Sequence, residues 1–218
     1  MTCGHRHLYV MLLMLLGKSP CADDNLLMLG DFSSGSLTHW QSREFKNQTQ
    51  YQVIDDDGTN VLKAESVNSA SGLFREQRID LQKTPILNWR WRVDNALGKI
   101  NEQSRSGDDY AARIYVVTRG GLAFWRTKAI NYVWASTTPK GKPWPNAFAG
   151  DNVMMMALRS SDDKIGTWYT EKRNVLADFK QQFHEDIPYV DAVAIMTDTD
   201  NTQSKATAYY GDIYFSKN

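Results

Sequence analysis

Charged side chains alternate with apolar ones in several short stretches of the sequence, and alternate residues of a strand lie on one face of its sheet. The charged residues of these stretches, with one tyrosine, are Arg90, Arg92, Asp109, Arg113, Tyr115, Glu171, Arg173 and Asp198. A guanidinium group binds a carboxylate or sulfate through two parallel hydrogen bonds. If these stretches share one groove, they predict a binding site for a polar or anionic polysaccharide or oligosaccharide.

The same residue types also allow catalysis. A glycosidase needs two carboxyl groups about 5–10 Å apart across the sugar bond. Glu171 with Asp198, or Asp109 with Glu171, would meet this requirement if their strands adjoin. A lyase would use Arg113 to neutralise a uronate and Tyr115 or His184 to move the proton. Glu171, Tyr115 and Asp198 are therefore the catalytic candidates, and the sequence leaves binding and degradation of a polysaccharide both open.

A third reading assigns these side chains to ion pairs along a solvated sheet face, or to a protein interface in an envelope scaffold. The stretch IMTDTDN, residues 195–201, shows the ambiguity, because an apolar run ends there in four oxygen-bearing side chains. It lacks the glycine and the third acid of an EF-hand loop. A turn, the edge of a ligand groove and a metal or catalytic site all remain open for it.

Two kinds of tryptophan are distinguishable by their surroundings. Trp89 and Trp91 alternate with charged residues on one strand, which predicts that both rings lie in the core. Trp144 lies in the loop 136–151 among three of the six prolines. We expect this loop to be stiff and to display the Trp144 ring as a flat surface for a sugar.

Composition excludes several other functions. Lys and Arg number 25, as do Asp and Glu, and the formal net charge is zero, so the clustered basic face that nucleic acid requires is not expected. Both cysteines, Cys3 and Cys21, lie in the first 22 residues. Outside those residues the sequence has two histidines, His39 and His184, and their wide separation argues against a zinc site. The sequence contains no G-x-S-x-G elbow, phosphate loop or dinucleotide fingerprint.

The dominant hydrophobic period is two, so the residues above should lie on strands. Residues 51–66 read as a hairpin around Asp57-Gly58, and seven further runs alternate or are apolar at similar spacing. Only residues 173–186 have a helical apolar stripe, with Asn174 as a possible N-cap. One helix among eight or more strands predicts an all-β fold, an antiparallel β-sandwich of jelly-roll type with one short helix.

The first residues predict export. A basic start is followed by a nine-residue apolar run from Leu8 to Leu16 and by small residues near Ala22. Such a run is too short to span a bilayer and has the form of a secretory signal. We therefore expect a signal peptide at 1–22 and a single β-sandwich domain at 23–218, secreted to the periplasm and without a transmembrane span. Lipidation at Cys21 remains an alternative.

The ends of the predicted domain carry a resemblance. The stretches LGDFSSGSLTHW (29–40) and AYYGDIYF (208–215) resemble the frame of jelly-roll carbohydrate-binding modules. In many of these modules, an aspartate of the last strand helps to hold a structural calcium ion. The resemblance thus implies a calcium site with Asp212 and Asp31 as ligands, although Asp212 could instead accept backbone N–H groups in a turn.

A second resemblance covers most of residues 28–216. The stretches SGLFREQRIDL, NWRWRV and EKRNVLADFKQQF are similar to those of a secreted bacterial family, domain of unknown function 3047. This resemblance implies export and the sandwich fold, and it implies no activity.

Overall fold

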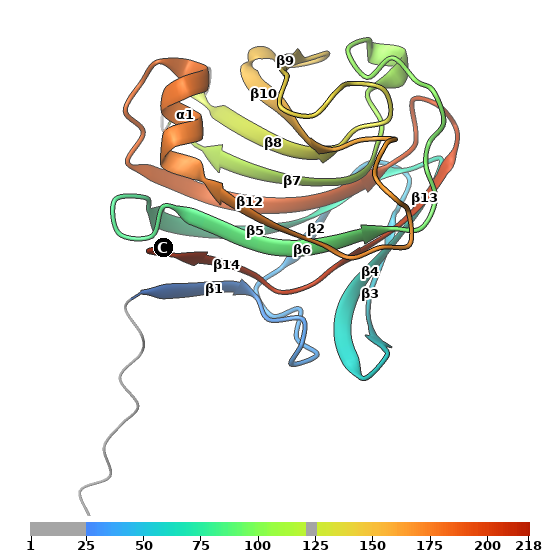
Figure 1. Cartoon of the computed structure of the whole chain (residues 1–218), viewed down its shortest axis with the longest axis horizontal. Helices are drawn as coiled ribbons and strands as arrows, with labels where there is room; N and C mark the ends of the chain where they lie inside the picture. The colour runs from blue at the N-terminus through green and yellow to red at the C-terminus, as the bar shows by residue number, and fades with distance from the viewer. Residues whose placement is uncertain (1–24, 121–125) are drawn as a thin grey trace, which may run out of the picture.

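The protein is a sandwich of two β-sheets (Figure 1). The structure is a computed structural model and describes residues 25–120 and 126–218. Each sheet has seven strands, and one α-helix occurs within the described ranges. The predicted fold class, an antiparallel β-sandwich with one short helix, is confirmed. The predicted signal peptide lies outside the described residues.

The first sheet has the strand order β1-β14-β6-β13-β4-β3, and β11 pairs with the other edge of β6. β13 and β14 pair in succession with the same edge of β6 because the chain breaks its strand at Gly211 and Asp212. The strands are β1 (Leu26–Gly30), β3 (Gln50–Asp56), β4 (Thr59–Val67), β6 (Ile86–Val93), β11 (Tyr169–Asn174), β13 (Lys205–Tyr210) and β14 (Ile213–Ser216).

The second sheet has the order β2-β5-β12-β7-β8-β10-β9 and rises in Figure 1 from β5 to β9 at the top. All of its pairs are antiparallel except β8 with β10. The strands are β2 (Gln41–Lys46), β5 (Ala70–Asp80), β7 (Tyr110–Thr118), β8 (Lys128–Trp134), β9 (Pro143–Asn146), β10 (Gly150–Arg159) and β12 (Tyr189–Asp198).

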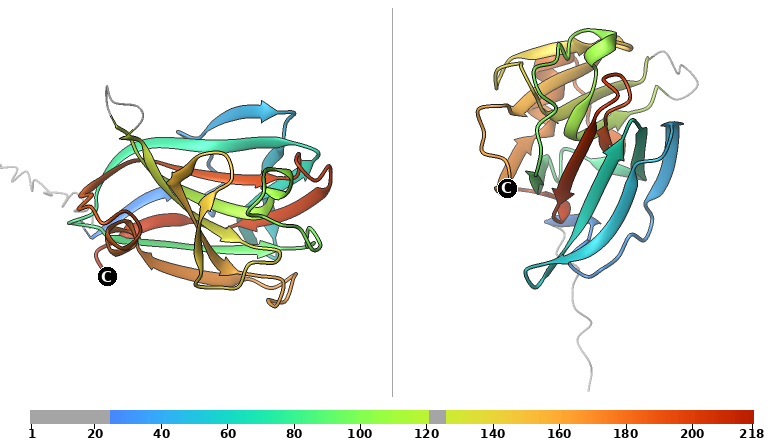
Figure 2. Two further views of the ribbon diagram at one scale, coloured as in Figure 1. Left: turned by 90° about the horizontal axis from the view of Figure 1, so that it is seen from above. Right: turned by 90° about the vertical axis from the view of Figure 1, so that its right-hand side faces the viewer.

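The predicted hairpin is formed by β3 and β4, which project beyond the rest of the first sheet (Figures 1 and 2). Asp57 and Gly58 at its tip both have positive φ angles, 54° and 83°. Two successive positive φ angles define the type I′ turn, whose twist matches that of the flanking strands. The Asp-Gly pair therefore fixes the register of this hairpin.

The core lies between the two sheets and contains both predicted tryptophans. Trp89 and Trp91 of β6 are almost fully buried, and the Trp89 ring packs on Tyr132 of β8 at a centroid distance of 5.5 Å. Because side chains alternate along β6, burial of these rings turns Arg90 and Arg92 to the outer face of the first sheet. The prediction that the two tryptophans are core residues is confirmed.

The helix α1 (Val175–Phe183) begins where Asn174 accepts a hydrogen bond from the N–H of Ala177 at 3.0 Å. It ends at His184, which adopts a left-handed conformation with a φ of 56°. Phe179 packs into the core. Within residues 25–120 and 126–218, no helix is long and apolar enough to cross a membrane. A short 3-10 helix, η1 (Arg105–Gly107), lies in the loop before β7.

Candidate functional site

The predicted site residues do not share one groove, so the expectation of a single hollow that gathers them is wrong. Four lie at the outer face of the second sheet: Asp109, Arg113, Tyr115 and Asp198. Four belong to the outer side of the first sheet: Arg90, Arg92, Asp31 and Asp212. Glu171 and Arg173 lie on the inward-facing side of β11, at the edge of the sandwich. Trp144 is in β9.

The first of these places has the features of a ligand site. A hollow of about 400 Å³ opens on the outer face of the second sheet, near the end of β12. Its wall includes three aromatic and three acidic side chains, namely Phe45, Tyr115, Phe148, Asp108, Asp198 and Asp200. Apolar surface with a few convergent polar groups is the usual composition of a small-molecule or oligomer site.

A second hollow of about 330 Å³ lies along the same three strands, β5, β7 and β12. Glu76 at its wall forms ion pairs with Arg43 at 2.6 Å and with Arg119 at 2.5 Å. Met196 of β12 lines the first hollow and Ala192 lines the second. Four residues of strand separate them, which corresponds to about 13 Å at the usual rise. The two hollows therefore lie in line on one face.

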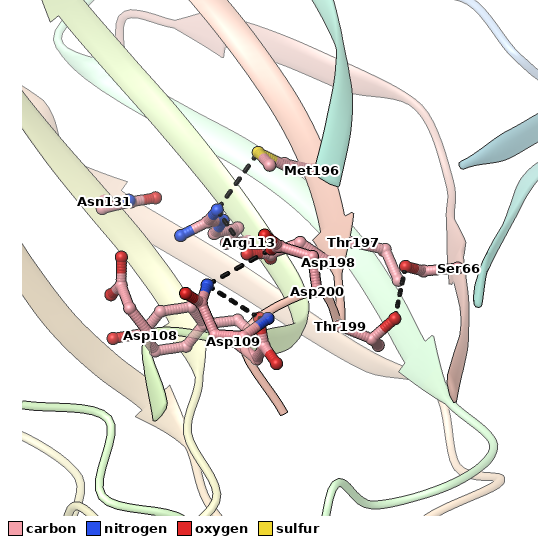
Figure 3. Close-up of polar contacts among 12 residues, drawn as sticks. Ser66, Asp108, Asp109, Arg113, Asn131, Met196, Thr197, Asp198, Thr199 and Asp200 are labelled. Carbon is pink, nitrogen blue, oxygen red and sulfur yellow. Dashed lines mark hydrogen bonds and ion pairs between the residues drawn. The ribbon is translucent and has the colours of Figure 1, made fainter. Parts of the chain in front are cut away.

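A buried ion pair forms the floor of the first hollow. Arg113 Nη2 lies 2.7 Å from Asp198 Oδ2 and 3.1 Å from the sulfur of Met196 (Figure 3). The rings of Tyr110 and Tyr115 flank the guanidinium at 5.1 and 5.0 Å. Burial and the neighbouring carboxylates raise the pKa of Asp198 well above its usual value, although Arg113 opposes this. Arg113 Nη2 is thus already engaged by Asp198, whereas its Nε has no hydrogen-bond partner among the described residues.

Asp109 holds the loop that follows β12. Its Oδ1 accepts from the backbone and side-chain nitrogens of Asn201, and its Oδ2 accepts from the N–H and hydroxyl of Thr202 at 2.7 and 2.5 Å. Carboxylate oxygens of Asp109, Asp198 and Asp200 lie within 4.8 Å of one another, as a metal site would require. However, both oxygens of Asp109 are occupied and Arg113 already supplies a positive charge. The cluster therefore fits a metal ion poorly.

Glu171 and Arg173 are structural residues. Glu171 Oε1 accepts from Trp91 Nε1 at 3.0 Å and from Arg159 Nε at 2.6 Å. Arg173 pairs with Asp178 of α1 at 2.5 Å. Since β11 belongs to the first sheet, Glu171 does not face Asp198 or Asp109 across a groove. The expected pairs of catalytic carboxylates that contain Glu171 are not formed.

Arg90 and Arg92 lie together on the outer face of the first sheet, and their guanidinium carbons are 4.6 and 5.2 Å from the centroid of the Trp168 ring. Arg92 also pairs with Asp56 at 2.9 Å and Asp94 at 3.0 Å. A small hollow of about 230 Å³ lies beside Arg90. These arginines thus cannot reach the hollow that contains Arg113, which is on the other sheet.

Asp212 closes the loop that follows β1. Its two oxygens accept from the N–H of Ser33 at 2.8 Å and from the Ser33 hydroxyl at 2.6 Å, and that hydroxyl also lies 3.3 Å from Asp31 Oδ1. The structure thus has the hydrogen-bonded arrangement that the sequence allowed. Two carboxylates around one hydroxyl would supply only part of the six to eight oxygens that calcium takes. The calcium site remains a prediction.

The proline-rich loop displays a different ring from the one expected. Trp144 is 4% exposed and packs with Tyr110 and Met155 in a buried cluster, so its predicted role as a sugar surface is wrong. Phe148, four residues later, is 55% exposed and lines the first hollow. Tryptophan is the better platform by type, but β9 pairs with β10 and the Trp144 ring packs against Met155 instead of facing solvent. Phe148 follows the end of β9 and is free of this pairing.

Sequence reasoning also missed Asp108, Asn146 and Phe45. The Asn146 amide lies 3.1 Å from both oxygens of Asp108, and Phe45 of β2 is 66% exposed. Asp108 directly precedes Asp109, and this doublet of acids before an apolar strand was the available signal. No local pattern indicates that Asn146 and Phe45, about a hundred positions apart, line the same hollow.

Several solved structures are similar in outline at low identity. The family 11 carbohydrate-binding module from Clostridium thermocellum, in complex with a β-1,3-1,4-mixed-linked tetrasaccharide, has a TM-score of 0.48 and 10% identity over 88% of this chain and 95% of its own. The endoglucanase cel12A from Rhodothermus marinus has a TM-score of 0.47 and 10% identity over 86% and 98%. The cellulose induced protein Cip1 gives 0.46 and 11% over 87% and 96%. Similarity at this level assigns no ligand or activity.

The sequence comparisons are more specific. No curated protein matches the chain. Residues 38–214 match the sequence profile of a family described as a protein of unknown function, DUF3047. This match covers most of the chain and includes the strands that line both hollows. The chain therefore belongs to the DUF3047 family.

Proposed function

We propose that this protein is an exported glycan-binding protein whose ligand lies along the outer face of the second sheet. The observation that carries this proposal is the pair of hollows in line on β5, β7 and β12. A ligand that fills both must be extended, as a polysaccharide chain is.

The composition of the first hollow supports a sugar ligand. Phe45 and Phe148 offer exposed rings, and a sugar ring has an apolar face that packs on such surfaces. Asp108, Asn146 and Asn201 offer carboxylate and amide groups that can accept from or donate to hydroxyl groups. Apolar rings beside planar polar groups suit a ligand with an apolar face and a hydroxylated edge.

Affinity gel electrophoresis with a panel of neutral, anionic and cationic polysaccharides tests the proposal. We expect at least one polymer to retard the protein, and Phe148→Ala to reduce the retardation. Tyr189→Ala is the matched control, because Tyr189 is an exposed aromatic residue that lines neither hollow. Absence of retardation by every polymer would overturn the proposal.

A polysaccharide hydrolase is the second candidate, and one observation favours it. Burial raises the pKa of Asp108 and of Asp198, and Asp200 lies in the same hollow. A glycosidase needs one carboxyl group that keeps its proton and one that is ionised. Release of reducing ends that disappears in Asp108→Asn would establish the hydrolase. The lyase reading loses its basis, since Arg113 is held by Asp198.

The location of the protein also belongs to the proposal. The apolar run from Leu8 to Leu16 supports export to the periplasm through a signal peptide that ends at Ala22. The intact mass of protein purified from the periplasm would show whether the chain begins at residue 23. A mature chain that begins at a lipid-modified Cys21 would instead indicate a membrane-anchored lipoprotein.

A further inference from the structure

We propose that the first hollow selects glycans that carry a positive charge, such as polymers of an amino sugar with a free ammonium group, and rejects uronate polymers. This inference rests on the proposed glycan-binding function and reverses the charge that the arginines in the sequence suggested. The reversal arises because Arg90 and Arg92 lie on the other sheet, and because Arg113 is engaged by Asp198.

The first argument is the balance of charge at the wall of the hollow. Three carboxyl groups, those of Asp108, Asp198 and Asp200, face it together with one guanidinium, that of Arg113. Arg113 Nη2 is engaged by Asp198 at 2.7 Å, and Arg113 Nε has no hydrogen-bond partner among the described residues. A fourth carboxylate, Asp109, lies behind them within 4.8 Å of Asp198 and Asp200. An anionic sugar would add to this repulsion, whereas an ammonium group would relieve it.

The second argument is an acceptor without a donor. Asp198 is 1% exposed and lines the hollow, yet its Oδ1 has no hydrogen-bond partner among the residues that the structure describes. A buried carboxylate oxygen left without a donor is costly. A ligand that brings N–H donors and positive charge would satisfy this oxygen. Burial raises the pKa of Asp198 and the surrounding carboxylates add to this, whereas Arg113 lowers it.

The basic side chains at the rim do not remove the imbalance. Lys46 lies 3.8 Å from Asp200 Oδ2, but its side chain is half exposed. Arg105 stacks on the Phe148 ring at 5.3 Å, on the exposed side of the hollow. Charges in contact with water are screened by salt and contribute little. The interior of the hollow therefore remains acidic.

An ammonium group fits the hollow better than a metal ion. Both oxygens of Asp109 already accept hydrogen bonds, so this residue has little to offer a metal. The hollow of about 400 Å³ also has room for a sugar ring. The rings of Phe45 and Phe148 at its wall attract organic cations through their faces. The same rings would pack on the apolar face of the sugar that carries the ammonium group.

The test compares three β-1,4-linked oligosaccharides that differ only at the second carbon: glucosamine, N-acetylglucosamine and glucose oligomers, with oligogalacturonate as the anionic probe. Calorimetry in EDTA at low salt, at a pH that keeps the amine protonated, excludes bridging by metal ions. We expect the glucosamine oligomer to bind at least about tenfold more tightly than any other, a factor worth about 1.4 kcal/mol. The preference should shrink as salt is added.

Each outcome bears on a distinct claim. A neutral or anionic glycan that binds as tightly as the glucosamine oligomer would overturn the charge selectivity and leave the glycan-binding function standing. Absence of binding by all four probes, together with no retardation in the wider polysaccharide panel, would overturn both. Retardation in that panel by uncharged or acidic polymers alone would also overturn the selectivity.

Variants connect the selectivity to the hollow. We expect Asp200→Asn to weaken binding of the glucosamine oligomer by about tenfold more than it weakens binding of a neutral glycan. Glu65→Gln is the matched control, because Glu65 is a half-exposed acid on the first sheet that pairs with Lys63. Equal losses for charged and neutral ligands in Asp200→Asn would show that the carboxylate acts through hydrogen bonds rather than through its charge, and would overturn the charge selectivity.

Discussion

The buried pair of Arg113 and Asp198 should be strongly asymmetric in its effect on stability. Arg113→Met removes the guanidinium at the wall of the first hollow and leaves Asp198 buried beside Asp109 and Asp200. Loss of one partner of a buried ion pair costs about 3–5 kcal/mol. With a urea m-value of about 2 to 3 kcal/mol/M, the unfolding midpoint should fall by about 1 to 2.5 M.

Asp198→Asn should have a far smaller effect. The oxygen of the new amide still accepts from Arg113, and Asp108 remains near the guanidinium. The substitution also removes one of the three neighbouring carboxyl groups, those of Asp109, Asp198 and Asp200. We expect a change of no more than about 1 kcal/mol in the free energy of unfolding. Arg43→Met is the control for loss of an exposed pair, here with Glu76, and should also change it by about 1 kcal/mol or less.

The stability of Asp198→Asn relative to the wild type should also depend on pH, in a direction that the pKa of Asp198 determines. The pKa of Asp198 is raised in the folded protein above its unfolded value of about 3.9. The folded state therefore binds this proton more tightly, and its contribution to stability is lost as the pH rises from the unfolded to the folded pKa. Asn cannot titrate, so the stability of Asp198→Asn relative to the wild type should improve with pH.

Urea unfolding monitored by tryptophan fluorescence, at several pH values, measures all three variants. The reasoning is refuted if Asp198→Asn destabilises the protein as much as Arg113→Met at neutral pH. It is also refuted if the relative stability of Asp198→Asn falls as the pH rises, because the carboxylate would then be held in its ionised form.

Three further predictions concern other parts of the chain. Asn174→Ala removes the N-cap of α1 and should lower the free energy of unfolding by about 1 kcal/mol in urea unfolding. Asp109→Ala frees four donors of residues 201–202 and should raise hydrogen exchange there while the β7 amides stay protected. If Asp212 and Asp31 bind calcium, millimolar calcium will raise the melting temperature, and Asp212→Asn will abolish the rise; an unchanged wild-type melting temperature contradicts the site.

The contrast between confirmed and wrong expectations follows from the range of the interactions involved. Strand alternation and the Asp57-Gly58 turn depend on neighbours in sequence, and the structure confirms both. The side of the sandwich on which a strand lies depends on pairing between distant segments. Glu171 illustrates this: its period-two pattern with Arg173 was correct, but β11 pairs with β6 and turns both toward the edge.

The local patterns of the sequence are enough to specify a β-sandwich with one helix, because period-two hydrophobicity and turn residues are local properties that a sheet and its hairpins require. Which charged groups meet depends on tertiary contacts. Whether Arg113 faces a ligand or contacts a carboxyl group of the protein depends on the register of β7 against β12, which places it near Asp198. Ionic interactions act through space over a few ångströms, so the charge of a hollow is a property of the fold rather than of any stretch of sequence.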